Sequence, residues 1–208
     1  MPLTDDVAVR RRISRQAQAT HERREQILDA AVAAFNESGF NGTSIRDVAA
    51  RVGMSHTGVL HHFPDKAALL EAVLDRRLER AVAEFPLETG DGEVFLRSLV
   101  ALAERDAQAP DDLRLYCTIA AEALSPTHPA HGYFTQWYHQ ARASVLTALL
   151  DLERRGHFTG HGVSIETAAV QIASMRDGLN QHWLLAPDEV DLVGATRAQL
   201  RFYTDLDL

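Results

Sequence analysis

Apolar residues recur every three to four positions along almost the whole chain after residue 20, and this spacing predicts helices. No run of alternating β-branched residues indicates a strand. Glycine and proline positions divide the pattern into nine expected helices, so the chain is predicted to be all-α. In chain order we expect a helix from Thr20 to Ser38, two short helices within 43–63, a helix capped by Asp65 and stopped at Phe85-Pro86, a helix closed by Ala109-Pro110, a helix closed by Ser125-Pro126, and helices at 131–155, 164–186 and 188–205.

The segment 43–66, TSIRDVAARVGMSHTGVLHHFPDK, predicts two short helices joined by a tight turn. Ser44 is expected to cap the first of them, with Asp47 as the acid of a capping box. Gly53 supplies the backbone freedom of a sharp turn, and Ser55 caps the second helix. The apolar positions predicted to face inward are Ile45, Val48, Ala49, Val52, Val59 and Phe63. The small and polar residues between them form an outward face that suits a DNA major groove.

These residues resemble the DNA-binding domain of the TetR family of bacterial transcription regulators. The resemblance covers about the first 75 residues and rests on Ile27, Leu28, Ala31, Val32, Phe35, Gly39, Phe40, Thr43, Ile45, Val48, Ala49, Gly53, Ser55, His62, Phe63, Lys66, Leu69 and Leu70. It implies an N-terminal helix-turn-helix domain and a C-terminal helical domain for ligand binding and dimerisation. One position departs, because the family usually carries a tyrosine where this chain has Leu60. The phosphate contact of that tyrosine is then lost, or is made by His61 or His62.

The predicted DNA contacts lie at helix N-termini and on the outward face of the second short helix: Thr43, Ser44, Arg46, Ser55, His56, Thr57, Gly58, His61, His62 and Lys66. Arg46 can pair bidentately with guanine, although a surface arginine that pairs with Asp47 or is simply solvated is the alternative. The hydroxyls and the lysine at helix N-termini can bind phosphate. Gly58 costs about 1 kcal/mol of helix propensity with no evident packing gain, which favours a functional reason. His62 is expected either to bind phosphate or to pack on Phe63.

The net charge of −8 argues at first against a nucleic-acid partner, but the charge is unevenly distributed. Residues 1–66 hold nine Lys/Arg and eight Asp/Glu, whereas 67–208 hold twelve and twenty-one. The arginines at the N-terminus predict a basic arm that follows phosphates or enters the minor groove: Arg10, Arg11, Arg12, Arg15, Arg23 and Arg24. A solvated tail is the alternative. The predicted domains are an arm at 1–19, a helix-turn-helix domain at 20–66 and a ligand-binding and dimerisation domain at 67–208.

Large rings and polar groups from several helices of the C-terminal part are predicted to line an effector pocket: Phe95, Tyr116, Phe134, Trp137, Tyr138, Arg176 and Trp183. Core packing is the alternative for each of them singly. Small and apolar residues of the last two helices predict a two-fold dimer seam: Ala168, Ala169, Ile172, Ala173, Leu179, Leu192, Val193, Thr196 and Leu200. The expected function is a homodimeric repressor that a small-molecule effector releases from a near-palindromic double-stranded DNA operator.

Several other classes of function find little support. Cys117 is the one cysteine, so no intrachain disulfide forms, and the absence of a long apolar segment predicts a cytoplasmic protein without a membrane anchor. The histidine pairs His128/His131 and His157/His161 lie beside proline or among glycines, so no metal site is expected. No catalytic or cofactor-binding motif is present. The rival hypothesis is a cytosolic metal-binding or enzymatic helical protein whose helix-turn-helix pattern is coincidental.

Overall fold

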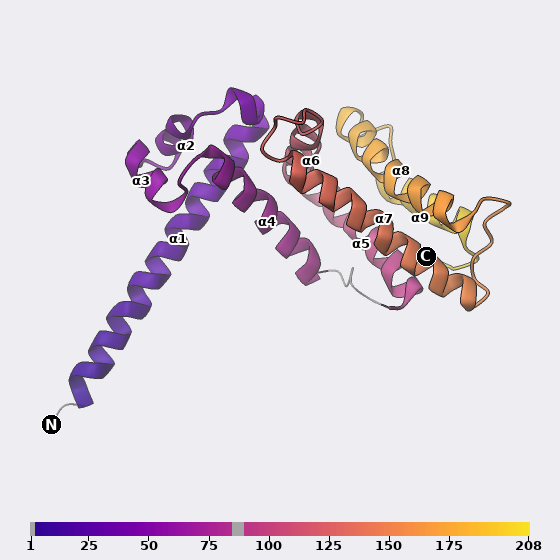
Figure 1. Cartoon of the computed structure of the whole chain (residues 1–208), viewed down its shortest axis with the longest axis horizontal. Coiled ribbons are helices and arrows are strands. Elements are labelled where there is room, and N and C mark those ends of the chain that lie inside the picture. The colour runs from indigo at the N-terminus through magenta and orange to yellow at the C-terminus, as the bar shows by residue number, and fades with distance from the viewer. Residues whose placement is uncertain (1–2, 85–89) are drawn as a thin grey trace. The chain divides into compact units, whose positions relative to one another are not determined.

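The structure is a computed structural model that describes the backbone of residues 3–84 and 90–208 and the side chains of 17–81, 83–84 and 90–208. Within these ranges it contains nine helices, as the apolar spacing predicts (Figure 1). They are α1 (Leu3–Gly42), α2 (Ile45–Arg51), α3 (His56–His62), α4 (Lys66–Glu84), α5 (Gly92–Gln108), α6 (Pro110–Glu122), α7 (His131–Arg154), α8 (Ile165–Leu185) and α9 (Leu192–Tyr203). None of these described helices is long and apolar enough to cross a membrane.

The chain divides into two compact units, Met1–Val73 and Leu74–Leu208. The division falls inside α4 rather than at residue 66, where the sequence placed it. Leu69 and Leu70, in the first turns of α4, are 0% and 1% exposed within the first unit. The beginning of α4 therefore belongs to the core of the helix-turn-helix unit, and its second half belongs to the other unit.

Helix α1 begins at Leu3, so the expected start at Thr20 is wrong. The intervening residues contain no glycine or proline, and most of them favour helix. The side chains of the arm arginines from Arg10 to Arg15 lie outside the described residues. At the other end the regular helix stops at Gly39, as predicted, because its φ of 67° and ψ of 178° are not helical.

The first unit packs α1, α2, α3 and the start of α4 around one set of buried side chains. These are Ile27, Leu28, Ala31, Phe35, Phe40, Ile45, Val48, Ala49, Val59, Phe63, Leu69 and Leu70. The inward positions predicted for the motif are buried, apart from Val52, which is half-buried. This core fixes how the outward faces of α2 and α3 are presented.

In the second unit, α7 packs on α8, and α5 packs on both α7 and α9. Figure 1 shows these long helices running beside one another. The main core joins their facing residues: Phe95, Leu96, Val100, Val145, Ala148, Leu149, Leu152, Ile165, Ala168, Ala169, Ile172, Leu200 and Tyr203. A smaller cluster of Ala103, Leu113 and Leu192 is covered by Leu179 and Trp183.

The residues predicted to form a dimer seam lie mostly inside the subunit. Ala168, Ala169 and Ile172 are at most 3% exposed, because α8 turns this face toward α7 and the core. Leu192 and Leu200 of α9 are buried in the same way. The predicted seam is therefore wrong, since helix packing within one chain already covers it.

Candidate nucleic-acid interface and internal cavity

Helices α2 and α3 form a capped helix-turn-helix. The Ser44 backbone N–H donates to the Asp47 carboxylate at 2.8 Å, and the Asp47 N–H donates to the Ser44 hydroxyl at 3.3 Å. This is the predicted capping box. Gly53 makes the turn with a φ of 64°, and the Ser55 hydroxyl accepts the Gly58 N–H at 3.0 Å. These local bonds fix the N-terminus of α3.

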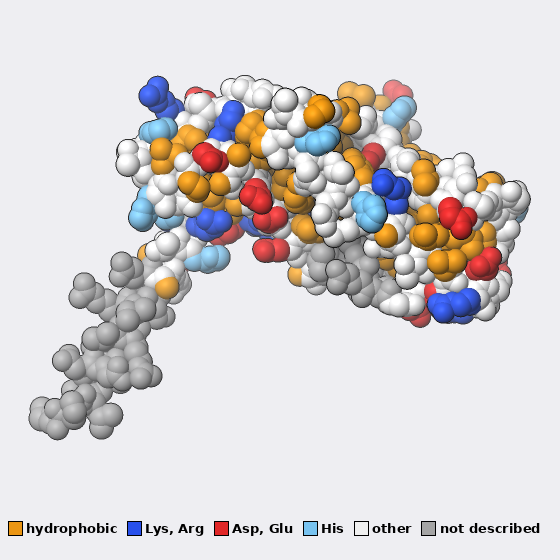
Figure 2. Space-filling view, viewed as in Figure 1, with side chains coloured by type: hydrophobic (Ala, Val, Ile, Leu, Met, Phe, Trp, Pro, Cys, Tyr) orange, Lys and Arg blue, Asp and Glu red, His pale blue; other side chains and the backbone are white. Residues whose placement is uncertain are grey.

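Among the predicted DNA contacts, six are exposed: Ser44, Arg46, Ser55, His56, Thr57 and His61. The Asp47 carboxylate binds the hydroxyl and the N–H of its own N-cap residue, so it does not pair with Arg46. Figure 2 shows histidine side chains gathered where Figure 1 places α3. The exposed residues of the motif thus offer an arginine, two imidazoles and three hydroxyls to a partner.

His62 is half-buried at the C-terminal end of α3. Burial lowers its pKa, and repulsion from His61, Arg24 and Arg23 lowers it further. The Arg24 guanidinium donates to the His62 carbonyl at 3.3 Å and lies 4.2 Å from the centre of the Phe63 ring. Arg24, predicted as part of a basic arm, therefore holds the end of the recognition helix in place.

Thr43 and Lys66 anchor the connection between α1 and α2. The buried Thr43 hydroxyl lies 2.7 Å from the Gly39 carbonyl and 3.0 Å from the Ala34 carbonyl, so it has partners within the chain and its phosphate contact stays a prediction. The Lys66 ammonium donates to the Phe40 and Thr43 carbonyls, both at 2.8 Å. Because these bonds use two of the three N–H groups of the ammonium, Lys66 has a structural role that the sequence did not indicate.

Gly58 has a packing reason that the sequence argument lacked. A Cβ atom at this position would lie 3.1 Å from the Met54 terminal methyl carbon and 3.2 Å from the Ser55 hydroxyl oxygen. Both distances are tighter than ordinary contacts. The absence of a side chain therefore preserves the turn and its cap, and it no longer indicates a DNA contact by itself.

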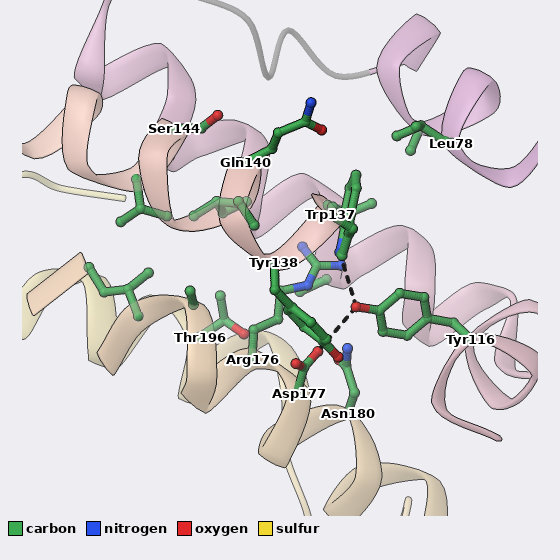
Figure 3. A pocket seen from close by; sticks show the side chains of 18 of the residues that line it. Leu78, Tyr116, Trp137, Tyr138, Gln140, Ser144, Arg176, Asp177, Asn180 and Thr196 are labelled. Carbon is green, nitrogen blue, oxygen red and sulfur yellow. Dashed lines mark hydrogen bonds between the residues drawn. The ribbon is translucent and has the colours of Figure 1, made fainter. Parts of the chain in front are cut away.

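The second unit encloses a cavity of about 370 Å³. Its wall includes the predicted residues Phe95, Tyr116, Trp137, Tyr138 and Arg176 (Figure 3). Helices α4 to α9 all contribute side chains, and most of the wall is apolar. This volume suits a small organic ligand.

Two of the predicted pocket residues, Phe134 and Trp183, do not line the cavity. The buried Phe134 ring supports the wall from behind, with ring centres 5.5 Å from Tyr116 and 6.1 Å from Tyr138. Trp183 packs instead on the cluster that contains Leu113. The periodicity of one helix could not show which of its large rings would face the cavity.

A chain of hydrogen bonds crosses the polar end of the cavity. The Trp137 indole N–H donates to the Tyr116 hydroxyl at 3.1 Å, which in turn donates to the Asp177 carboxylate at 3.4 Å (Figure 3). Burial raises the pKa of Asp177, while hydrogen bonds from Tyr138 and Tyr116 oppose the rise. Burial also raises the pKa of Tyr138 to about 12, so both phenols stay neutral donors at physiological pH.

Asp106 lies beside this cavity at 1% exposure and faces three guanidinium groups. Its carboxylate oxygens lie 2.7 Å from Arg176, 3.5 Å from Arg77 and 3.9 Å from Arg105. Sequence reasoning missed this cluster. The position of Asp106 in the sequence could have indicated this cluster. Asp106 continues the apolar stripe through Leu102, and a carboxylate on such a helix face needs a buried partner.

A sequence model described as "Bacterial regulatory proteins, tetR family" matches residues 27–73. Over 191 residues the chain is 31% identical to the "Probable HTH-type transcriptional regulator ArpR" of Pseudomonas putida, covering 88% of this chain and 90% of that protein. The chain belongs to the tetR family. It is accordingly a DNA-binding transcriptional regulator, as the resemblance of residues 43–66 implied.

Solved structures agree with the fold of this TetR-family regulator. A TetR transcription regulator from Haloarcula marismortui superposes with a TM-score of 0.72 at 24% identity, covering 89% of this chain and 97% of that chain. SmeT of Stenotrophomonas maltophilia, in its complex with triclosan, superposes with a TM-score of 0.73 at 22% identity, covering 89% and 92%. At such identities the superpositions establish the all-α architecture, and the roles of individual residues are inferred from their contacts in this structure.

The histidine pairs considered for metal binding make other contacts in this TetR-family protein. The His128 ring accepts the Ala130 N–H at 3.2 Å, and the His131 ring donates to the Ala123 carbonyl at 2.8 Å. His157 pairs with a carboxylate near the C-terminus. Across the described residues, no three His, Cys, Asp or Glu side chains are grouped as metal ligands would be.

Proposed function

We propose that this TetR-family regulator is a cytoplasmic repressor that binds a near-palindromic operator as a homodimer and leaves it when a small molecule fills the cavity. The observation that carries the proposal is the exposed N-terminal face of α3, held on a capped and fully packed helix-turn-helix. The solved relative SmeT is a repressor of a multidrug efflux pump and also has a complex with triclosan. Repression combined with ligand binding therefore occurs on this fold.

On the DNA side, the outward residues divide into base readers and phosphate binders. Arg46, His56 and Thr57 are exposed at the starts of α2 and α3, where side chains of a helix-turn-helix reach base edges. Ser55 accepts a hydrogen bond from its own helix, which leaves the hydroxyl proton to donate to a phosphate oxygen. His61 is the exposed candidate for the phosphate contact that Leu60 cannot make.

The proposed dimer uses the outward face of α8 in place of the buried one. Exposed residues recur along this face at helical spacing: Thr167, Val170, Gln171, Ser174, Met175, Gly178, Gln181 and Leu185. Val170 is 48% and Leu185 is 86% exposed, and a Cβ at Gly178 would meet nothing within 4 Å. Small residues between apolar ones allow two helices to approach closely about a two-fold axis.

The DNA-binding proposal is tested by selecting genomic fragments with the purified full-length protein and sequencing those that are retained. We expect the retained fragments to share an inverted repeat with half-sites about one helical turn apart. Fragments that share no repeat, or that bind equally well at every sequence, would contradict an operator of this kind.

Arg46→Ala then tests the groove placement on the operator so defined. We expect a loss of about 1–3 kcal/mol in operator affinity and a relaxed preference at one base pair of each half-site. Arg114→Ala removes an equally exposed arginine of the second unit, whose partner is Asp111, and should leave affinity unchanged. Equal effects of the two substitutions would mean that Arg46 contributes only general charge.

Release by an effector is a separate step with its own test. A ligand weakens operator binding by the same factor by which operator weakens ligand binding. Titrating a cavity ligand by tryptophan fluorescence, with and without operator, measures both sides, since Trp137 lines the cavity. Equal ligand affinity in the two titrations would rule out induction and leave the DNA-binding assignment standing.

A further inference from the structure

The cavity wall presents hydrogen-bond donors that have no acceptor. The Asn180 side chain is 1% exposed, lines the cavity, and its amide nitrogen has no hydrogen-bond partner among the described residues. The Nε–H of Arg77, another lining residue, is buried and unpartnered as well. A buried donor left without an acceptor destabilises a protein, so two of them in one cavity indicate that a bound molecule supplies the acceptors.

The carboxylates nearby do not satisfy these donors. Asp177, the carboxylate among the described lining residues, accepts a hydrogen bond from the Tyr116 hydroxyl at 3.4 Å. Figure 3 shows Asp177, Tyr138 and Asn180 converging at this end of the cavity. The other carboxylate, Asp106, is buried behind the wall.

Two guanidinium groups of the cavity wall, those of Arg77 and Arg176, share the Asp106 carboxylate, while Arg105 also pairs with Glu84 at 3.7 Å. Arg176 makes the short contact at 2.7 Å, and Arg77 reaches the same carboxylate only at 3.5 Å. Arg105 stands at 3.9 Å and does not line the cavity. Arg77 also lies face-on to the Tyr116 ring, with 4.6 Å between the guanidinium carbon and the ring centre. Arg77 therefore places in the cavity wall a guanidinium group whose nearest carboxylate contact is 3.5 Å long.

We infer that the effector is an amphipathic organic acid, whose carboxylate is bound by Arg77 and Asn180 and whose apolar body lies along the rest of the wall. This inference rests on the proposed effector function of the cavity. The wall beyond these donors is apolar and aromatic, with Leu78, Phe95 and Trp137 as examples, which suits a ring or alkyl chain. A carboxylate is the group that a guanidinium and an amide N–H recognise together.

A cationic ligand is the competing class, because Asp177 and several aromatic rings lie in the same wall. Two observations disfavour it. Asp177 already accepts a hydrogen bond from the Tyr116 hydroxyl, and a cation would lie in the same cavity as Arg77 and Arg176. It would also leave the donors of Asn180 and Arg77 without acceptors.

The test compares three probes that differ in one group: 4-phenylbutyrate, 4-phenylbutyramide and 4-phenylbutylamine. Each is titrated calorimetrically into the purified full-length protein at neutral pH without DNA. We expect the acid to bind about tenfold more tightly than the amide, and the amine to bind most weakly. Equal binding of acid and amide, tightest binding of the amine, or no binding of any probe would overturn the inference.

Variants locate the carboxylate. Arg77→Met should remove most of the preference for the acid, whereas Arg105→Met disturbs the same Asp106 without touching the wall and should retain it. Asn180→Leu removes an unpartnered donor at similar volume, so it should weaken acid binding while the melting temperature stays equal or rises. Acid selectivity that survives both Arg77→Met and Asn180→Leu would place the carboxylate elsewhere and overturn the assignment.

These titrations contain no DNA, so they are independent of repression. A protein that selects the acid but keeps its operator in the presence of that acid would retain this inference and contradict induction. A protein that binds operator but prefers the amine would retain the DNA-binding proposal and contradict the inference that the effector is an acid.

Discussion

Lys66 can stabilise the helix-turn-helix or bind a DNA phosphate, and the substitution Lys66→Met distinguishes these two roles. Methionine keeps the length of the apolar stem but removes the ammonium. In the structure that ammonium donates to the Phe40 and Thr43 carbonyls, each at 2.8 Å, and lies 4.1 Å from the centre of the Phe40 ring. These carbonyls end α1 and lead into α2, so the substitution should loosen the start of the helix-turn-helix.

The expected loss of stability follows from these contacts. A hydrogen bond from a charged donor contributes about 1.5–3 kcal/mol, and the lower value applies because Lys66 is half-buried and water can reach the freed carbonyls. The ring contact adds about 0.5–1 kcal/mol. With two such bonds, the total of about 3.5–4 kcal/mol corresponds to a fall in melting temperature of about 7–16 °C for a chain of this length.

Thermal unfolding followed by circular dichroism measures this loss, with Arg51→Met as the control. Arg51 forms an exposed ion pair with Glu37, and such a pair contributes at most about 1 kcal/mol. If Lys66→Met leaves the melting temperature unchanged, and instead lowers operator affinity with a salt dependence weaker by about one phosphate, the structural reasoning is refuted. Lys66 would then be a phosphate contact.

Three further predictions concern other parts of the chain. Val170→Glu should give a soluble monomer by light scattering, whereas Ala169→Glu should unfold the protein, because Ala169 is only 2% exposed. A Val170→Glu variant that remains dimeric would show that the dimer interface lies elsewhere. Asp106→Asn should lower the free energy of unfolding by about 3–5 kcal/mol in urea titrations, because it removes a buried negative charge from three half-buried guanidinium groups. A loss below about 1 kcal/mol would show that these groups find other partners. Burial lowers the pKa of His62 in the folded state, so the stability that is present above the unfolded pKa near 6.5 is lost as the pH falls. His62→Gln should therefore flatten the decline in melting temperature between about pH 7 and 5. An unaltered decline would exclude His62 as the source of that decline.

The sequence predicted the helix-turn-helix in detail because its determinants are local. The caps and the turn depend on contacts with backbone groups only a few residues away, made by Ser44, Asp47, Gly53 and Ser55. The amino-acid sequence alone therefore predicts them. The contacts made by Lys66 cross more than twenty residues of sequence, and no periodicity reports them. In the structure, the residues predicted to contact DNA therefore fall into two groups: some face outward, and others stabilise the helix-turn-helix.

In the second unit, periodicity identified which faces are apolar without showing what covers them. The small residues of α8 satisfied the pattern of a dimer seam, but the same pattern serves packing within one chain. The outward face was recognisable only after α7 and α9 were in place. The cavity shows a similar limit: Tyr116, Trp137 and Tyr138 were found as a group, whereas Asp177 and Arg77 acquire meaning from partners on other helices.

Helix α4 is the element through which cavity and operator can be coupled. It runs without glycine or proline from Lys66 to Glu84, and the boundary between the two compact units falls within it. Its first turns carry Leu69 and Leu70 of the helix-turn-helix core, and about two turns further along the same helix Arg77 lines the cavity. We expect a ligand that binds Arg77 to change the contacts of a residue that also holds Asp106, and so to favour one position of that half of α4 over another. The coupling is then limited by the difference in ligand affinity between the two positions, and tight binding to both alike would leave the operator occupied.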